Sequence, residues 1–376
     1  MKITIIGAGP AGLYFADLMK RDNPSYDIHV YERNPQGATW GFGVVFSDRA
    51  LEFLRADDED MYQFLLPSME KWPDLTLVHK DQRMTIDGNG FAAIGRLQLL
   101  NMMQDRARKR GVEFHFETEI TALDDIRGAD LIVAADGANS LLRDGNREKF
   151  KTSVDYRPNR FIWYGTTKPF DSLTLTFRTT DDGVFCAHHY RYTPNMSTFL
   201  VEVDQATYDK AGFDGMSAEE SVRYCEKVFA ADLDGHAIVT NNSYWRNFPA
   251  IWNENWYAGN VVLLGDALRT AHFSIGSGTR LAMEDAIALN KAFGEAGDDI
   301  NVAFHRFEEI RRPPAEAIRT AANVSARWYE GMADLMHLAP YDFAHSYMTR
   351  TGRVSDQDLE KIAPGFMAAW RKNTGR

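Results

Sequence analysis

The opening segment places a glycine-rich turn between a short apolar strand and an amphipathic helix. Residues 2–6 (KITII) form a β-branched run, and Gly7, Gly9 and Gly12 follow at once in the pattern GxGxxG. Gly7 permits a tight turn, Gly9 lets the backbone approach a pyrophosphate, and Gly12 allows the helix to pack close to the strand. The N-terminus of that helix is then expected to face the phosphates.

A second strand over residues 27–31 ends at Glu32, which lies 20 residues after Gly12. A carboxylate at this place accepts hydrogen bonds from a ribose 2′-hydroxyl and would repel a 2′-phosphate. Glu32 and the adjacent Arg33 are therefore candidate cofactor-binding residues. Because strand, helix, second strand and acidic residue occur in this order, the segment predicts a dinucleotide-binding βαβ unit. It does not by itself separate FAD from NAD.

Two later segments each combine an apolar strand with an aspartate at its end. Residues 129–135 lead into Asp136, the first residue of a DGxxSxxR pattern, and residues 260–264 lead into Gly265 and Asp266. Such aspartates can accept hydrogen bonds from a ribitol chain, and a helix that follows a glycine-bearing turn can face developing negative charge on a flavin. These features favour FAD over NAD. The candidate contacts in that turn are Gly276, Gly278 and Thr279.

These three motifs resemble those of the FAD-dependent aromatic hydroxylases related to p-hydroxybenzoate hydroxylase, and the resemblance covers nearly the whole chain. Three segments are similar to salicylyl-CoA 5-hydroxylases, namely residues 41–54, 272–278 and 346–353. Three others are similar both to those enzymes and to the hydroxylase of violacein biosynthesis, namely residues 161–165, 187–192 and 196–202. By the same resemblance, Arg96 is expected to contact FAD.

The resemblance implies a monooxygenase that is reduced by NADH or NADPH, forms a flavin C4a-hydroperoxide with O2, and transfers oxygen to an activated aromatic ring. An aryl-CoA thioester such as salicylyl-CoA, hydroxylated at its 5-position, is the substrate that it favours. A free or indole-derived aromatic of a secondary-metabolite pathway is the alternative substrate. A flavoprotein that binds FAD as a sensor or structural ligand, without turnover, is the alternative of another class.

The predicted fold class is α/β, with a Rossmann-like FAD-binding domain interleaved with an antiparallel β-sheet substrate domain and followed by C-terminal helices. The FAD-binding domain is expected over residues 1–70, 92–150 and 255–310, the substrate domain over 71–91 and 151–254, and the helical region over 311–376. The β-rich runs between residues 156 and 204 are separated by turn residues, which predicts an antiparallel sheet with one covered face.

Two histidines are candidates for catalysis. His188 lies on the predicted substrate sheet, and His272 lies in the turn expected at the flavin edge. A base near the ring hydroxyl of the substrate would assist oxygen transfer, although a single histidine is more often structural. His189 should point to the opposite face of the strand from His188, because successive side chains of a strand alternate.

The composition argues against several other classes of protein. There are 42 basic and 53 acidic residues, and the resulting net charge of −11 opposes broad binding to nucleic acid or anionic membranes. Cys186 and Cys225 form no CxxC and no metal-ligand spacing, so we expect no disulfide and no metal. No apolar run approaches the ~18 residues of a membrane span, and no signal peptide is recognised. We therefore expect a cytoplasmic protein, and a homodimer is among the assemblies allowed.

Overall fold

A computed structural model describes residues 1–276 and 278–376, and the chain divides into two compact units. The first unit comprises Met1–Thr39, Leu97–Tyr156 and Pro249–Thr320. The second comprises Trp40–Arg96, Arg157–Phe248 and Ala321–Arg376. Within the described residues, no helix combines the length and the apolar character that crossing a membrane requires.

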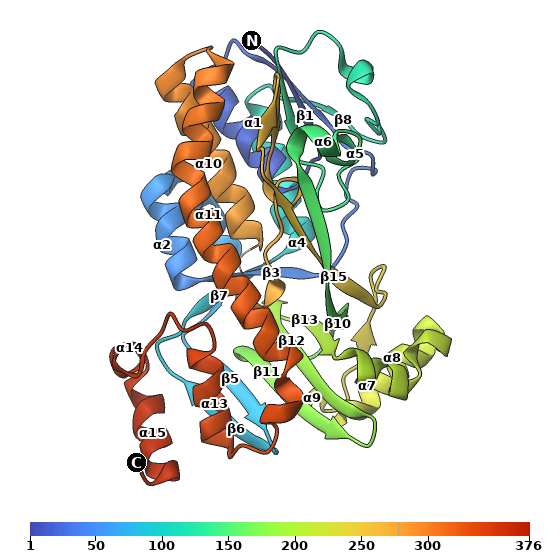
Figure 1. Cartoon of the computed structure of the whole chain (residues 1–376), viewed down its shortest axis with the longest axis vertical. Coiled ribbons are helices and arrows are strands. Elements are labelled where there is room, and N and C mark those ends of the chain that lie inside the picture. Colours follow the sequence, from blue (N-terminus) through green and yellow to red (C-terminus); the bar gives the residue numbers. More distant parts are fainter. Residues whose placement is uncertain (277) are drawn as a thin grey trace. The chain divides into compact units, whose positions relative to one another are not determined.

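The first unit is built on a six-stranded sheet in the order β16-β17-β9-β1-β2-β8, of which β1 and β8 are labelled in Figure 1. Its strands are β1 (Lys2–Ile6), β2 (Asp27–Tyr31), β8 (Glu113–His115), β9 (Leu131–Ala134), β16 (Tyr257–Ala258) and β17 (Val261–Leu263). All neighbouring strands are parallel except β16, which pairs antiparallel with β17. Ile3, Ile5 and Val133 are fully buried, as expected for β-branched residues of a parallel sheet whose two faces are covered.

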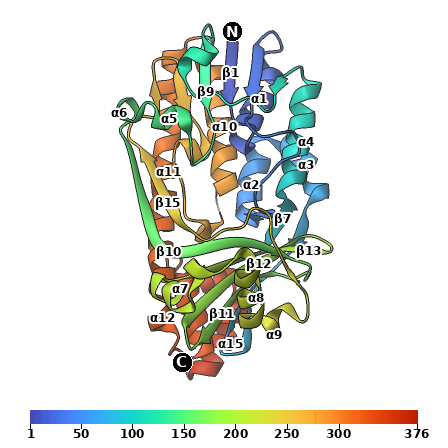
Figure 2. The same ribbon diagram turned by 90° about the vertical axis from the view of Figure 1, so that its right-hand side faces the viewer.

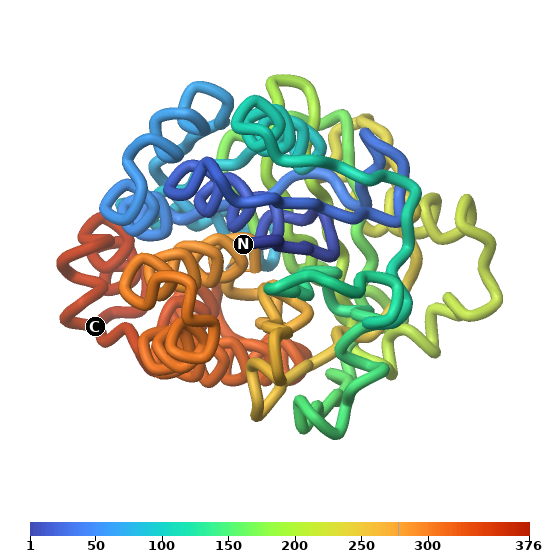
Figure 3. The backbone as a smooth tube through the Cα atoms, turned by 90° about the horizontal axis from the view of Figure 1, so that it is seen from above, coloured from blue at the N-terminus to red at the C-terminus, as the bar shows by residue number. Residues whose placement is uncertain are grey.

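Helices pack around this sheet. They are α1 (Pro10–Asp22), α4 (Arg96–Lys109), α5 (Leu141–Asp144), α6 (Arg147–Phe150), α10 (Gly278–Ala296) and α11 (Ile300–Glu330), which continues into the second unit. α1 packs against α10, and Figure 3 shows the blue N-terminal segment beside the orange helix. The buried carboxylate of Asp17 on α1 pairs with Arg106 at 2.8 Å and Arg110 at 2.7 Å. The basic end of α4 therefore stabilises the contact between two helices.

The second unit contains a large sheet in the order β14-β10-β13-β12-β11-β5-β6, with β15 paired to β10, and a small sheet in the order β3-β7-β4. Its strands are β3 (Gly43–Ser47), β4 (Glu70–Trp72), β5 (Leu75–His79), β6 (Gln82–Ile86), β7 (Phe91–Gly95), β10 (Thr152–Thr166), β11 (Leu173–Thr180), β12 (Gly183–Thr193), β13 (Met196–Val203), β14 (Ile238–Val239) and β15 (Arg246–Asn253). β10 and β15 extend into the first unit. The pairs along the large sheet are antiparallel except β5 with β11, which is parallel.

Both faces of the large sheet carry apolar clusters, so the expectation of one covered face is wrong. Cys186 packs in a cluster with residues of the C-terminal helices between 340 and 374, whereas its neighbours Phe185 and Ala187 pack in a cluster with residues of the helices between 205 and 233, which are labelled α7, α8 and α9 in Figure 2. The α-helices that lie wholly in the second unit are α2 (Asp48–Asp57), α3 (Glu59–Leu65), α7 (Gln205–Ala211), α8 (Ala218–Val228), α9 (Ala230–Leu233), α12 (Met332–Leu335), α13 (Pro340–Thr349), α14 (Asp356–Ile362) and α15 (Pro364–Thr374). The second face is covered because residues 205–233 fold into helices with an apolar side.

The parallel sheet, the mostly antiparallel sheet and the C-terminal helices confirm the predicted α/β class. The boundaries of the two compact units along the chain differ from those of the expected domains. Residues 40–70 group with the second unit because β3 pairs with β7, and residues 311–376 are divided after residue 320. The assignment of FAD and substrate to these parts of the chain stays a prediction.

Candidate functional site

The glycine turn after β1 leaves no space for side chains at two of its three glycines. Gly7 has φ +100°, and a Cβ there would lie 2.4 Å from the carbonyl oxygen of Ala135. A Cβ on Gly12 would lie 2.3 Å from the carbonyl oxygen of Gly7. At Gly9 the nearest described atom would be the Ala135 oxygen at 4.0 Å, so the chain leaves this side of the turn open to a ligand. Gly7 and Gly12 are thus required by the packing of the turn, and the contact of Gly9 with a pyrophosphate stays a prediction.

Helix α1 starts at this turn with its first amides available to an anion. Gly9 is the N-cap and supplies no side-chain hydrogen bond, Pro10 occupies the first turn, and no acidic residue lies in that turn. The first four N–H groups of a helix lack partners within the helix, and its dipole favours negative charge there. A diphosphate is the ligand that such a turn and helix can bind.

The carboxylate of Glu32 is fixed beside the turn. One oxygen accepts a hydrogen bond from the Ala8 amide at 3.0 Å, and the other accepts from the Asn34 amide at 2.9 Å and side chain at 2.7 Å. Oε1 already accepts two hydrogen bonds, whereas Oε2 accepts one and has a second lone pair with which to accept from a ribose hydroxyl. Arg33 is exposed and pairs with Glu119 at 3.7 Å, so its contact with a cofactor stays a prediction.

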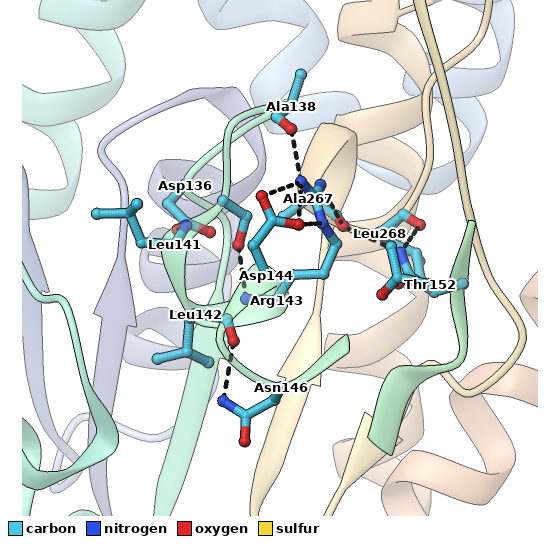
Figure 4. Close-up of polar contacts among 12 residues, drawn as sticks. Asp136, Ala138, Leu141, Leu142, Arg143, Asp144, Asn146, Thr152, Ala267 and Leu268 are labelled. Atoms are coloured by element: carbon cyan, nitrogen blue, oxygen red, sulfur yellow. Dashed lines mark hydrogen bonds and ion pairs between the residues drawn. The ribbon is translucent and has the colours of Figure 1, made fainter. Parts of the chain in front are cut away.

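Asp136 lies against the same turn, because a Cβ on Gly7 would lie 2.9 Å from the Asp136 Cα. Its Oδ2 accepts a hydrogen bond from the Leu141 amide at 3.0 Å (Figure 4). Its Oδ1 is buried and has no hydrogen-bond partner among the described residues. Burial raises the pKa of this carboxyl group. A buried acceptor without a partner is costly in a folded protein unless a ligand satisfies it.

Arg143, at the end of the DGxxSxxR pattern, has a structural role that the sequence reasoning missed. The side chain is 1% exposed and donates to the carbonyl oxygen of Ala138 at 2.8 Å and to that of Ala267 at 3.4 Å (Figure 4). Its own amide donates to Ser140 Oγ at 3.0 Å. Arg143 therefore links the Asp136 loop to the turn that contains Gly265 and Asp266. The available signal was an arginine directly after two leucines at the end of this motif.

The Gly265–Asp266 turn lies close to the start of α1. Gly265 has φ +59°, and a Cβ there would lie 3.1 Å from the Ala11 Cβ. The Asp266 side chain is exposed at this edge of the sheet. The carboxyl ends of β1, β9 and β17 thus bring the glycine turn, Asp136 and Asp266 to one edge, which is where parallel α/β sheets bind ligands.

A buried ion-pair cluster supports this turn, and the sequence reasoning also missed it. Both oxygens of Asp285 on α10 accept from Arg269 at 2.7 Å, and one accepts from Arg311 on α11 at 2.8 Å. The Gly265 amide donates to the same carboxylate at 3.2 Å. Burial acts to raise the pKa of Asp285, but the charges of Arg269 and Arg311 outweigh it, and the pKa lies below its usual value.

His272 is buried and serves as the N-cap of a short 3-10 helix over Phe273–Ile275. Its Nδ1 accepts a hydrogen bond from the Ser274 amide at 3.3 Å, which places the ring proton on Nε2. Gly276 ends this turn with φ +60°, and α10 begins at Gly278 with Thr279 next in the helix. The cap is a structural role for His272. Contacts of His272, Gly276, Gly278 and Thr279 with a flavin stay predictions.

In the second unit, His188 belongs to a buried polar group on the large sheet. Its Nε2 lies 3.3 Å from Glu202 Oε2, and the other oxygen of Glu202 accepts from Asn159 at 2.8 Å. The imidazole also packs on Tyr329, with ring centroids 5.0 Å apart. His189 contacts Thr176 Oγ1 at 2.9 Å in the cluster on the other face. The expected opposite orientation of the two histidines is confirmed.

Arg96 belongs to the second unit. Its amide donates to the carbonyl oxygen of Phe42 at 2.7 Å. Burial raises the pKa of Tyr190, and a hydrogen bond with Thr198 and the charge of Arg96 partly oppose that effect. The Tyr190 hydroxyl donates to Gly43 at 2.9 Å. Contact between Arg96 and FAD stays a prediction.

Comparison with known proteins decides the family. No family model matches the chain. A salicyloyl-CoA 5-hydroxylase from a Streptomyces species is 41% identical, over 96% of this chain and 72% of the relative. The chain belongs to the FAD-dependent aromatic hydroxylases. The predicted resemblance is thereby confirmed.

Two further relatives of this aromatic hydroxylase are also close. Protodeoxyviolaceinate monooxygenase of Chromobacterium violaceum is 37% identical over 93% of this chain and 94% of the relative. A 3-hydroxy-4-methyl-anthranilyl-(aryl-carrier protein) 5-monooxygenase of Streptosporangium sibiricum is 35% identical over 97% of this chain and 98% of the relative. A crystal structure of 2-methyl-3-hydroxypyridine-5-carboxylic acid oxygenase shares the fold, with a TM-score of 0.71 at 18% identity over 96% of each chain.

As a member of this family, the aromatic hydroxylase is an enzyme that uses FAD, NAD(P)H and O2 on an aromatic substrate. The residues at the carboxyl edge of the parallel sheet fit such a cofactor. The open side of the turn at Gly9, the uncapped start of α1 and the buried Oδ1 of Asp136 each offer what a dinucleotide requires. The flavin, when bound, supplies the redox and oxygen-transfer chemistry. The chain binds the flavin and the substrate, orients them, and shields them from water.

Proposed function

We propose that this aromatic hydroxylase acts on an aromatic acid carried as a thioester on a pantetheine arm, with an aryl-CoA such as salicylyl-CoA as substrate and the 5-position as the site of hydroxylation. The 41% identity with a salicyloyl-CoA 5-hydroxylase over 96% of the chain carries the proposal. The relative that acts on an anthranilyl group bound to a carrier protein supports it, because CoA and carrier proteins present an acyl group through the same kind of arm.

The cofactor residues are proposed from the first unit. The turn at Gly7, Gly9 and Gly12 and the start of α1 would hold the pyrophosphate, and Glu32 would accept from the adenosine ribose. Asp136 and Asp266 would accept from the hydroxyls of the ribitol chain. The segment Gly276–Thr279, of which residue 277 lies outside the described residues, would face the flavin ring through its amides.

The test measures kcat/KM for product formation with a panel of matched substrates. Purified FAD-loaded protein is given NADH or NADPH with salicylyl-CoA, anthranilyl-CoA, the corresponding free acids, and indole-derived aromatics. We expect the best thioester to exceed its free acid by roughly 100-fold or more, because the arm contributes binding energy that positions the ring. Equal or faster hydroxylation of the free acid would contradict the thioester assignment.

One specific observation favours a second candidate substrate. The chain is 37% identical to a monooxygenase of protodeoxyviolaceinate, so an indole-derived aromatic is the alternative within the same chemistry. If hydroxylated product forms only from indole-derived substrates, the indole-derived aromatic is the substrate. Flavin that stays oxidised in the presence of both NADH and NADPH, with every substrate added, would instead favour a sensor or structural flavoprotein. A homodimer and a cytoplasmic location stay predictions.

His188 is proposed as the base that accepts a proton from the ring hydroxyl, oriented by Glu202. His188→Gln keeps a side chain able to hydrogen-bond Glu202 but removes the titratable group. We expect this variant to retain FAD and to hydroxylate about 10²-fold more slowly, with loss of one limb of the pH–rate profile. His189→Gln, on the opposite face, is the matched control and should keep that limb. A His188→Gln profile identical to that of the wild type would rule out the role.

A further inference from the structure

Three potential metal ligands converge at the outer edge of the six-stranded sheet. Single ligand atoms of His29, Glu113 and His115 lie within 4.8 Å of one another. His29 Nδ1 lies 3.0 Å from His115 Nε2 and 3.4 Å from Glu113 Oε2. The cysteine spacing predicts no metal in this chain. The cluster of His29, Glu113 and His115 also matches no short sequence motif, because it forms only when β8 pairs with β2.

The sheet register places the three side chains together. β2 and β8 are parallel, with His29 opposite Glu113 and Tyr31 opposite His115. Alternate residues of a strand share a face, so all four side chains lie on the same face of the sheet. The ring of His115 stacks on Tyr31, with centroids 4.5 Å apart, which fixes its orientation.

A carboxylate outside the trio orients the His29 ring. His29 Nε2 lies 3.0 Å from Asp27 Oδ1. An ionised carboxylate only accepts, so Nε2 carries the proton and Nδ1 presents its lone pair to Glu113 and His115. Metal-bound histidines usually donate their second ring N–H to a carboxylate in this way. Without a cation, His115 Nε2 can donate to the His29 Nδ1 lone pair at 3.0 Å, while a Glu113 carboxylate oxygen also faces that lone pair across 3.4 Å; a bound ion would take the place of the shared proton.

The geometry points to a divalent transition-metal site formed by His29 Nδ1, His115 Nε2 and a Glu113 carboxylate oxygen, of the class that binds Zn²⁺, Co²⁺ or Ni²⁺. Two imidazoles and one carboxylate match the preferences of these ions rather than those of Mg²⁺ or Ca²⁺. Ligand nitrogens at ~2.0–2.1 Å from zinc in tetrahedral geometry lie roughly 3.3 Å apart, close to the 3.0 Å between His29 and His115. Water would complete the coordination, since only three protein atoms converge.

The ion would clamp an edge strand that carries part of the cofactor-binding frame. β8 has only three residues and ends the sheet. The carbonyl oxygen of His115 accepts from the Glu32 amide at 2.9 Å, and the Thr118 amide donates to the Glu32 carbonyl at 3.0 Å. A metal that joins His29 to His115 therefore stabilises the pairing next to Glu32. The Glu113 side chain is 65% exposed, so an ion can enter from solvent.

The test is metal titration of the whole FAD-loaded protein after dialysis against a chelator. Calorimetry with Zn²⁺ should give one site per chain, and Co²⁺ should give ligand-field absorption at wavelengths beyond the flavin bands. Zn²⁺ at saturation should raise Tm by roughly 2–4 °C and slow amide exchange in β8. His115→Gln and His29→Gln should each weaken Zn²⁺ binding by at least about 100-fold, and Asp27→Asn by about 10-fold or more.

His305→Gln is the matched control, because His305 is an exposed histidine on α11 of the same unit. The control should bind Zn²⁺ as the wild type does. Metal-free Tm values near that of the wild type would show that the variants fold, and because His29 and His115 are changed separately, one unstable variant leaves the other informative. The site is refuted if Zn²⁺, Co²⁺ and Ni²⁺ all bind the His115→Gln and His29→Gln proteins as well as the control.

Discussion

Gly12→Ala is expected to yield a protein that no longer retains FAD and melts several degrees lower than the wild type. The new Cβ would lie 2.3 Å from the Gly7 carbonyl oxygen and 3.0 Å from Ile5 Cγ2. The first of these is a backbone atom of the glycine turn and cannot move aside as a side-chain tip would. Overpacking of this kind costs about 1–3 kcal/mol or more, and here the shift would displace the turn and the start of α1.

Two further substitutions separate the fold from the ligand site. Gly294→Ala on α10 meets no described atom within 4 Å, so it should leave FAD binding unchanged and add up to ~1 kcal/mol of helix stability. Gly9→Ala meets only the Ala135 oxygen at 4.0 Å, so it should preserve the Tm of the apoprotein yet weaken FAD binding. The measurements are flavin absorbance after gel filtration and thermal unfolding. A Gly12→Ala protein that binds FAD with wild-type affinity would contradict the packing argument.

Asp285→Asn is expected to cost about 3–5 kcal/mol of unfolding free energy, the range found when one partner of a buried ion pair is removed. Asp285 is fully buried, and the change would remove the carboxylate that pairs with the buried Arg269, while Arg311 would keep its ion pair with Glu284 at 2.7 Å. The Gly265 amide would lose its charged acceptor as well. Because this amide begins the Gly265–Asp266 turn, we expect weaker FAD binding along with the loss of stability.

Glu295→Gln on the same helix is the matched control for Asp285→Asn. Its carboxylate pairs with Arg306 at 2.7 Å, but the two side chains are 56% and 39% exposed. Exposed pairs of this kind contribute little, so the control should change the unfolding free energy by less than about 1 kcal/mol. Denaturant unfolding at neutral pH measures the unfolding free energies of both variants. If the Asp285→Asn protein and the control had equal unfolding free energies, the buried ion pairs of Asp285 would not be needed for stability.

The pH dependence of the Asp285 effect follows from the direction of its pKa shift. The two arginines outweigh burial and hold the folded-state pKa below the usual value, which is ~3.9 in an unfolded chain. The stabilisation is therefore complete above the unfolded pKa and is lost as pH falls through the folded pKa. The difference in unfolding free energy between wild type and Asp285→Asn should be constant from about pH 5 to 8 and shrink below about pH 4.

The parts of the site that could be predicted from sequence are those formed by neighbouring residues. The glycine turn and its helix depend on local backbone geometry, and Glu32 follows β2 directly, so one segment of 32 residues was enough to predict the βαβ unit. Arg143 and Asp285 were missed because their partners, at Ala267 and at Arg269 and Arg311, come together only in the fold.

The wrong expectation of one covered face has the same origin. Alternation along a strand shows which side chains share a face, but it does not show which helices will cover that face, so the helices of residues 205–233 were not expected over the large sheet. Residues 40–70 follow the βαβ unit along the chain, yet β3 pairs with β7, 40 residues or more away. The pairing of β2 with β8, which brings His29 to His115, is equally invisible from either strand alone.

The most direct test of the central claim is a turnover experiment with isotopically labelled O2. FAD-loaded protein, NADH or NADPH and the thioester panel are incubated under the labelled gas. The thioester is then hydrolysed, and the mass of the released aromatic acid is measured by mass spectrometry. An aromatic hydroxylase should place one labelled oxygen atom on the ring of each product molecule, in proportion to the NAD(P)H consumed. A colourless protein, or NAD(P)H consumption without labelled aromatic product from any substrate, would contradict the account.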